Sequence, residues 1–325
     1  MTSPICPRAD RRCTNKDLVK AKPNRPTHLR RTAILHILWP LNRTGPGPLR
    51  TLILRRAGGH VTMSSVDNRV YITVPVTALW ASPTASRDVD RWAVAPLPDV
   101  IAWLADLDTA EARQALHGRV LTQLECCEPV IITGDGGMRS RGAAKQPWLR
   151  IVAPMQPSGL DGRGYPGWVR AEHIGEIIPN CLSPTSTSHP QQTAPQAQAF
   201  IASARKHLGV PYLWGGMCDV GLDCSGLVHL SLRRIGVLVP RDADDQYDAC
   251  EHIPADQARP GDLYFFARHG RRPHHVGIVT GPGRMLHAPQ TGSMVIEEEL
   301  TAPRRVTLIG AGRLPLAPST TGSTG

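Results

Sequence analysis

Three side chains in the C-terminal third of the chain could form a nucleophile with its base. Cys224 lies in PYLWGGMCDVGLDCSGLVHLSLRRIG, residues 211–236, and His275 and His287 follow downstream. A cysteine thiolate is a strong nucleophile, and an imidazole in contact with the thiol can take its proton. A second polar side chain can orient that imidazole, as in a catalytic triad. These residue types indicate hydrolytic or acyl-transfer chemistry.

A helix is expected to position the cysteine. The pattern predicts that it begins at Cys224–Ser225 and ends near Gly236, with Leu227, Val228, Ser231 and Ile235 as its buried stripe. The positive end of the helix would favour a thiolate, and its unpaired N–H groups could hold an oxyanion. The alternative is a small buried cysteine without catalytic function, which is the commoner fate of a lone cysteine.

A hairpin is expected to position the two histidines. Residues 276–280 and 285–287 read as strands, and Gly281, Pro282 and Gly283 form the turn between them. His275 and His287 then lie side by side, so that one can take the proton from Cys224 and the other can orient it. The alternative is a pair of histidines in a sheet without a catalytic role.

Four motifs in order give this region a family resemblance. LGVPYLWGG with DCSG, VPRDADDQ, ARPGDLYFF and HHVGIVTGPGRMLHAP resemble the successive motifs of the NlpC-type cell-wall cysteine peptidases. The resemblance implies a papain-like α+β fold. It also implies Cys224 as nucleophile, His275 as general base and His287 as the orienting residue, with His274 as a neighbour only.

The same resemblance suggests how a substrate would bind. Tyr212 would line the site, and Asp223 and Ser225 would recognise the N-terminal amine of a peptide. A carboxylate is a natural partner for an ammonium group, but the position of Asp223 equally predicts a helix cap. Arg241 and Gln246 are expected to be structural.

The front half resembles the Src-homology-3-like barrel that precedes the peptidase domain in enzymes trimming γ-D-glutamyl-diamino-acid peptides. The matching motifs are TALWASP, LTQLECCEPVII and GYPGWV. Cys126 falls where some relatives carry a tyrosine, and residues 169–210 leave no room for a second barrel. Residues 69–80 and several short later segments read as strands, and residues 98–118 as helices with Asp106 or Asp108 as caps.

These patterns predict an α+β chain, with a papain-like peptidase domain preceded by a small β-barrel domain. The expected parts are a basic, disordered segment at 1–62, a barrel domain at 63–175 with a helical insertion, a linker at 176–194, a peptidase domain at 195–316 and a flexible tail at 317–325.

The distribution of charge and of cysteines indicates which partners and which cellular location to expect. The net charge is +10, but residues 1–62 hold 13 Lys/Arg against two acids, so the remainder is close to neutral and nucleic acid is not an expected partner. No apolar run is long enough for stable membrane insertion. The eight cysteines form no CxxC pair, which slightly favours a reducing, cytoplasmic location over secretion.

The expected activity is that of a thiol protease. It would hydrolyse the γ-D-glutamyl–diamino acid bond of peptidoglycan-derived peptides with a free N-terminal L-Ala, without cofactor or metal. The alternatives are an endopeptidase of intact cell wall, a wall-binding module without activity, and an amidase or acyltransferase of related fold. A zinc site made from Cys218, Cys224, His229, His274 and His275 is disfavoured because the cysteines lack tight ligand spacing.

Overall fold

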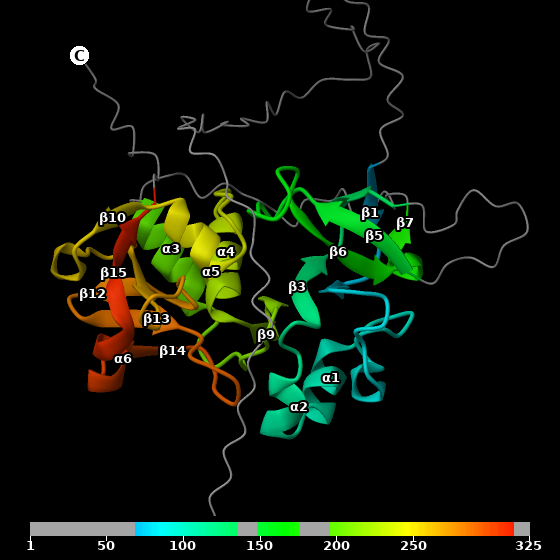
Figure 1. Ribbon diagram of the computed structural model, residues 1–325, viewed down its shortest axis with the longest axis horizontal. Coiled ribbons are helices and arrows are strands. Elements are labelled where there is room, and N and C mark those ends of the chain that lie inside the picture. Colours follow the sequence, from blue (N-terminus) through cyan, green and yellow to red (C-terminus); the bar gives the residue numbers. More distant parts are fainter. Residues whose placement is uncertain (1–68, 135–147, 176–195, 315–325) are drawn as a thin grey trace, which may run out of the picture. The chain divides into compact units, whose positions relative to one another are not determined.

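The fold is known from a computed structural model that describes residues 69–134, 148–175 and 196–314 (Figure 1). The chain divides into two units after Thr62, and all described residues belong to the unit that begins at Met63. The expected disordered segment, the linker at 176–194 and the tail lie outside the described residues. Among the described helices, none is long and apolar enough to cross a membrane.

The first half is built on an antiparallel sheet of seven strands. Their order is β3-β2-β6-β5-β4-β1-β7, with β3 and β7 at the two edges, so hydrogen bonding does not close the described strands into a ring. The expected small barrel is therefore an open sheet here. The strands are β1 (Arg69–Ile72), β2 (Val76–Trp80), β3 (Val120–Glu125), β4 (Pro129–Ile132), β5 (Trp148–Ala153), β6 (Tyr165–Arg170) and β7 (Ile174–Gly175).

Local sequence explains two departures from the expected elements. The single strand expected at 69–80 is broken between β1 and β2, and Pro75 in the break has no N–H to donate to a ladder. The helical segment forms two short helices, α1 (Val100–Asp106) and α2 (Ala110–Gln114). Their caps are the side chains of Asp99 and Thr109, not those of Asp106 or Asp108.

The second half combines helices with a sheet of six strands in the order β10-β15-β11-β12-β13-β14. Its strands are β10 (Glu251–Ile253), β11 (Leu263–Phe266), β12 (His275–Gly281), β13 (Arg284–His287), β14 (Ile296–Glu299) and β15 (Leu308–Arg313). The helices are α3 (Gln196–Arg205), α4 (Cys224–Arg233), α5 (Ala243–Asp248) and α6 (Ala302–Thr307), and the short ribbon β8 (Met217–Cys218) with β9 (Gly221–Leu222) precedes α4.

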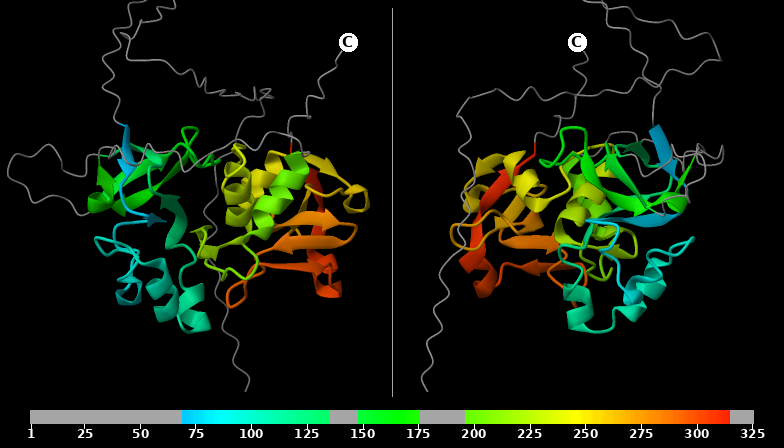
Figure 2. Two further views of the ribbon diagram at one scale, coloured as in Figure 1. Left: turned by 180° about the vertical axis from the view of Figure 1, so that it is seen from behind. Right: turned by 45° about the vertical axis from the view of Figure 1, so that its right-hand side comes forward.

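Helices α3 and α4 pack against one face of this sheet, as the views in Figure 2 show. Phe200 and Leu227 of the helices share a core with Phe265 and Ile278 of the strands. Every residue from Cys224 to Leu232 is buried, so α4 is enclosed on all sides and does not show the single stripe expected from its sequence. A helix enclosed in this way holds its first residue firmly in place.

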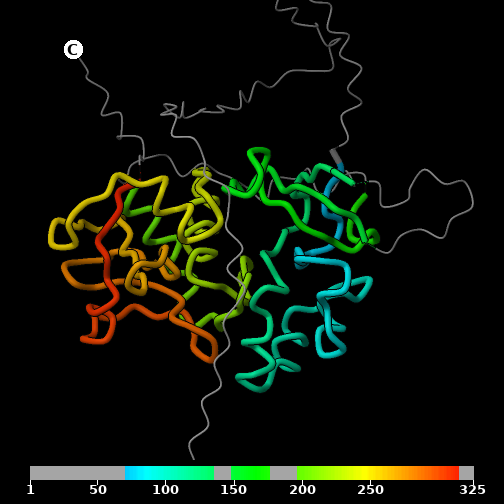
Figure 3. Tube along the Cα trace, viewed as in Figure 1, coloured from blue at the N-terminus to red at the C-terminus, as the bar shows by residue number. Residues whose placement is uncertain are grey.

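Strand β3 of the first sheet is bound directly to the second half of the chain, and both parts can be followed in Figure 3. The Gln123 side-chain oxygen accepts from the Met217 N–H at 2.9 Å, and the Val120 carbonyl accepts from the Trp214 indole at 3.1 Å. Just after β3, the Glu128 carboxylate pairs with Arg233 of α4 at 2.8 Å. The loop before α4 and the last residue of α4 are therefore bound to the first sheet.

We expect the Glu128–Arg233 pair to contribute measurably to stability. The Glu128 side chain is fully buried and Arg233 is 17% exposed, so Glu128→Gln leaves a guanidinium poorly solvated and should lower the free energy of unfolding by about 3 kcal/mol. Urea unfolding measures this loss. In the matched control, Glu172→Gln breaks a more exposed pair with Arg170 and should cost at most about 0.5 kcal/mol. Equal losses in the two variants would contradict the expectation.

Candidate active site

Cys224 is the first residue of α4, as its sequence predicts. The side chain of Asp223 caps the helix by accepting from the Gly226 N–H at 2.6 Å. Gly226 has no space for a side chain, because a Cβ there would lie 2.2 Å from the Gly216 carbonyl oxygen. The DCSG motif therefore forms a capped helix start that packs closely against the preceding loop.

The surroundings of the Cys224 thiol oppose its ionisation. Burial, followed by the neighbouring Asp223 carboxylate, raises the pKa of Cys224 to about 12, although the Val276 and Ser225 N–H groups and Arg241 act in the opposite direction. These directions act against the thiolate expected at the helix terminus, and that thiolate stays a prediction. These directions favour a neutral thiol in the resting site.

The predicted hairpin brings the two histidines into contact. His275 Nε2 lies 2.8 Å from His287 Nδ1, and both side chains are buried. Burial lowers the pKa of His275 well below its usual value, and burial with the Arg304 charge lowers the pKa of His287 to about 3. These directions favour neutral imidazoles near pH 7. The backbone N–H that binds the Cys224 sulfur belongs to Val276, the residue after His275, which places the thiol at the start of this strand.

Strand β14 adds a residue that the sequence reasoning missed. Glu298 Oε1 lies 3.0 Å from His287 Nε2 and extends the hydrogen-bonded row to a carboxylate. His287 pairs directly with Ile296 across the two strands, so Glu298 is its diagonal neighbour on the same face. The signal was the EEE triplet at 297–299, but the triplet alone does not say which glutamate faces His287.

Asp223 and Ser225 flank the cysteine and already have protein partners. The Asp223 carboxylate accepts from the Gly215 N–H at 2.9 Å and from both terminal nitrogens of Arg241 at 3.0 and 2.8 Å, in addition to the helix cap. The Ser225 hydroxyl accepts from Arg241 at 2.9 Å. Arg241, expected to be structural, is fully buried and also donates to Thr122 of β3 at 2.8 Å. This geometry accounts for Asp223 as a cap and ion-pair partner.

Two aromatic residues and one further histidine lie near this carboxylate. The Tyr212 hydroxyl is largely buried within the fields of Cys224 and Asp223, and its role in lining the site stays a prediction. His117, from the segment after α2, stacks on Trp214 with ring centroids 3.5 Å apart and is within the field of Asp223. Sequence reasoning missed His117 because nothing in the chain order connects it to residues a hundred positions away.

Other polar groupings in the described part of the chain have separate explanations. Asp242, Asp244 and Asp245 lie close enough to share a metal ion, but they already bind the Tyr165 hydroxyl, Arg272 and the Gly159 N–H, respectively. Residues from the disfavoured zinc set have other contacts: Cys218 approaches the Gly221 carbonyl, and His229 the Val239 carbonyl.

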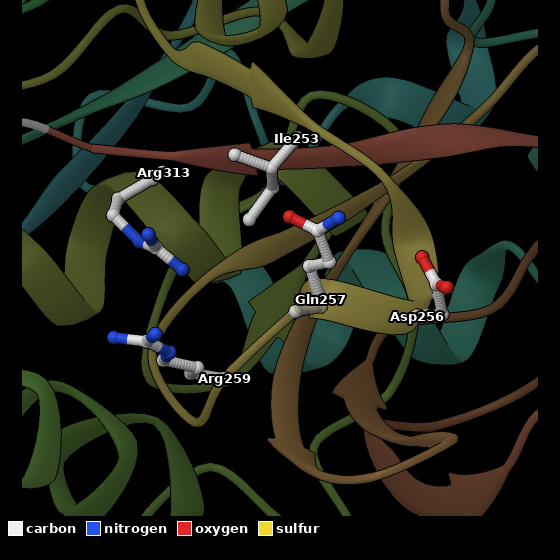
Figure 4. A pocket seen from close by; sticks show the side chains of 6 residues that line it. Ile253, Asp256, Gln257, Arg259 and Arg313 are labelled. Atoms are coloured by element: carbon white, nitrogen blue, oxygen red, sulfur yellow. The ribbon is translucent and has the colours of Figure 1, made fainter.

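A surface hollow lies elsewhere in the second half, and Figure 4 shows the side chains that line it. Its lining includes Arg259 and Arg313, but Arg313 is paired with Asp262 at 2.8 Å. None of its lining residues belongs to the site formed by Cys224, His275, His287 and Glu298.

Comparison with known proteins decides the family. Residues 209–307 match the model described as NlpC/P60 family. Peptidoglycan endopeptidase RipB of Mycobacterium tuberculosis is 36% identical over 164 residues, which cover 45% of this chain and 67% of RipB. The chain belongs to the NlpC/P60 family. It is a cysteine peptidase, a hydrolase of the papain-like type.

Two further relatives of this NlpC/P60 protein match its first half as well. The Bacillus subtilis protein named gamma-D-glutamyl-L-lysine dipeptidyl-peptidase is 29% identical over 309 residues, which cover 76% of this chain and 98% of that protein. A solved NlpC/P60 family structure from Bacillus cereus covers 75% of this chain and 99% of its own, with a TM-score of 0.65 at 21% identity, and so supports the fold alone. The Src-homology-3-like character of the first sheet stays a prediction.

The neutral resting state of this NlpC/P60 site is testable by alkylation. A raised thiol pKa means that thiolate is scarce at neutral pH, so the rate at which iodoacetamide modifies Cys224 should rise about tenfold per pH unit from pH 6 to pH 9. Mass spectrometry of the Cys224 peptide separates this reaction from that of the exposed Cys126. A rate that is constant between pH 6 and pH 8 would indicate a preformed thiolate–imidazolium pair and would contradict the neutral state.

Proposed function

We propose that this protein is a cysteine endopeptidase that hydrolyses the γ-D-glutamyl–diamino acid bond of peptidoglycan stem peptides. Its substrates are released peptides with a free N-terminal L-Ala. The observation that carries the proposal is the enclosed His275–His287 pair beside Cys224. It is supported by the match to 98% of a relative named gamma-D-glutamyl-L-lysine dipeptidyl-peptidase.

In the proposed acylation step, Cys224 Sγ attacks the carbonyl carbon of the γ-D-glutamyl bond. The thiol proton moves to the nitrogen of His275 that does not contact His287, while the S–C bond forms and the carbonyl electrons move to the oxygen. N–H groups at the start of α4 face the developing oxyanion. The imidazolium then gives its proton to the diamino-acid nitrogen, the C–N bond breaks, and a thioester remains on Cys224.

In the proposed deacylation step, the same imidazole serves again. It takes a proton from water as the water oxygen attacks the thioester carbonyl, and it returns the proton to the sulfur as the C–S bond breaks. His287 holds the ring of His275 throughout and takes no part in bond making. The scheme needs no preformed thiolate, because proton transfer accompanies the attack and does not precede it.

The proposed selectivity for a free N-terminus places an ammonium group near Asp223 and Tyr212. Asp223 already accepts from Arg241 and from two backbone N–H groups, so its net attraction for a cation is reduced. His117 lies within the field of the same carboxylate. An ammonium group at Asp223, near Tyr212 and Ser225, would therefore share this carboxylate with Arg241.

The alternative function is cleavage of intact cell-wall peptidoglycan. RipB, a relative of higher identity over the peptidase part, is named a peptidoglycan endopeptidase. The two functions use the same chemistry at Cys224 and differ in the substrate that reaches it.

We expect the three site residues to differ in the cost of their removal. Cys224→Ala removes the nucleophile and should lower kcat by at least about 10⁴-fold, with His275→Ala nearly as severe. His287→Ala should cost less, about 10²- to 10³-fold, because the imidazole orients the base and does not react. Steady-state hydrolysis of a stem peptide measures all three. Full activity in Cys224→Ala would overturn the proposed mechanism.

The substrate class is tested with one peptide in two forms. Free L-Ala-γ-D-Glu-meso-diaminopimelate should be cleaved, whereas the N-acetylated peptide should not, because acetylation removes the ammonium group that the site is proposed to recognise. Chromatography of the products gives both rates, with Cys224→Ala as the blank. Equal cleavage of both forms would favour the wall endopeptidase and would contradict the selectivity for free peptides.

A further inference from the structure

The row of polar side chains that begins at His275 ends on a carboxylate. His275 Nε2 contacts His287 Nδ1 at 2.8 Å, and His287 Nε2 contacts Glu298 Oε1 at 3.0 Å. The three residues come from the adjacent strands β12, β13 and β14. Both rings are buried, while the Glu298 side chain is 29% exposed and reaches the rings from the solvent side.

A carboxylate at the end of this row fixes the position of every proton in it. An ionised carboxylate only accepts hydrogen bonds, so His287 Nε2 must carry a proton. In a neutral imidazole the other nitrogen is then an acceptor, so His287 Nδ1 must receive a proton from His275 Nε2. His275 is left with a lone pair on Nδ1, which is the form that can accept the thiol proton.

The opposite arrangement would disable the base. If His287 carried its proton on Nδ1, it would donate to His275 Nε2, and neutral His275 would hold its own proton on Nδ1. That nitrogen could not take a proton from Cys224. The hydrogen bond between the two rings allows either arrangement, so a third group must choose between them.

The packing at β13 and β14 leaves this choice to Glu298. A Cβ on Gly277 would lie 3.4 Å from the His287 Cβ and 2.8 Å from the Met285 sulfur, so the glycine lets β13 pack closely beside β12. The neighbouring glutamates have other partners: Glu297 pairs with Arg205 at 2.9 Å, and Glu299 with Arg284 at 3.3 Å. Arg304 lies 3.9 Å from Glu298, and its charge acts on both imidazoles.

We propose that Glu298 is a positioning residue that selects the proton arrangement in which His275 can act as a base. Glu298 acts through His287 and does not touch the substrate. This inference rests on the proposed roles of Cys224, His275 and His287.

The test combines kinetics with a direct observation of the tautomers. Glu298→Gln and Glu298→Ala are compared with Glu297→Gln and Glu299→Gln, which alter the adjacent carboxylates of the same strand. Each full-length variant is assayed on the free tripeptide for kcat and KM, and its imidazole nitrogens are observed by NMR after ¹⁵N-histidine labelling. His275→Gln and His287→Gln assign the two rings by the signals that they remove.

We expect the wild-type protein to show protonated Nε2 and bare Nδ1 in both His275 and His287. Glu298→Ala should mix the two tautomers of His287 and lower kcat about 10- to 100-fold with KM unchanged, less than the ~10⁴-fold cost where the carboxylate contacts the base directly. Glu298→Gln should lie between Glu298→Ala and the wild type, because its amide oxygen can still accept. The Glu297 and Glu299 variants should keep wild-type kcat and tautomers.

Two results would overturn the inference. One is a wild-type spectrum with the proton on Nδ1 of either ring, which needs no variant and no substrate. The other is a Glu298→Ala protein that keeps the tautomers and the kcat of the Glu299→Gln control. The tautomer measurement does not depend on turnover, so a failure of the peptide assay would count against the proposed substrate, and an unchanged tautomer would count against Glu298.

Discussion

The arrangement of this site depends on one buried ion pair, between Arg241 and Asp223. The guanidinium binds both carboxylate oxygens and the hydroxyl of Ser225, and it extends to Thr122 on the first sheet. Asp223 in turn caps the helix that carries Cys224. Removing one member of a buried pair leaves the other charge poorly solvated, which is strongly unfavourable. The pair therefore joins the first sheet, the helix start and the nucleophile in one unit.

That ion pair also clarifies the electrostatics around the cysteine. A free carboxylate beside a thiol would oppose ionisation strongly, and Arg241 offsets part of this effect. Burial nevertheless remains the largest influence on Cys224, and it acts on His275 in the opposite sense, so that both groups favour their neutral forms. A neutral Cys224 thiol with a neutral His275, oriented through His287 and Glu298, is an alternative to a preformed thiolate–imidazolium pair.

The sequence was informative for the parts of the site that neighbouring residues form. Cys224 at a helix start and two histidines on one hairpin follow from local patterns, because turn residues and strand periodicity act over a few positions. Long-range partners were harder to find. Arg241 was expected to be structural, but its partner Asp223 was not identified. Glu298 was not singled out among three glutamates, because strand alternation does not say which residue faces a histidine on the next strand. His117 was missed because its contact with Trp214 depends on tertiary packing, which no local pattern encodes.

The position of β14 has a consequence for how the protein tolerates heat. Among the described strands it lies at the edge of its sheet and pairs with β13 alone. Edge strands open locally at a lower free energy than the core of a domain. Separation of β14 from β13 would remove Glu298 from His287 while α4 and the inner strands stayed folded. Local opening of this edge strand would therefore lower activity at temperatures at which a melting curve still reports an intact fold.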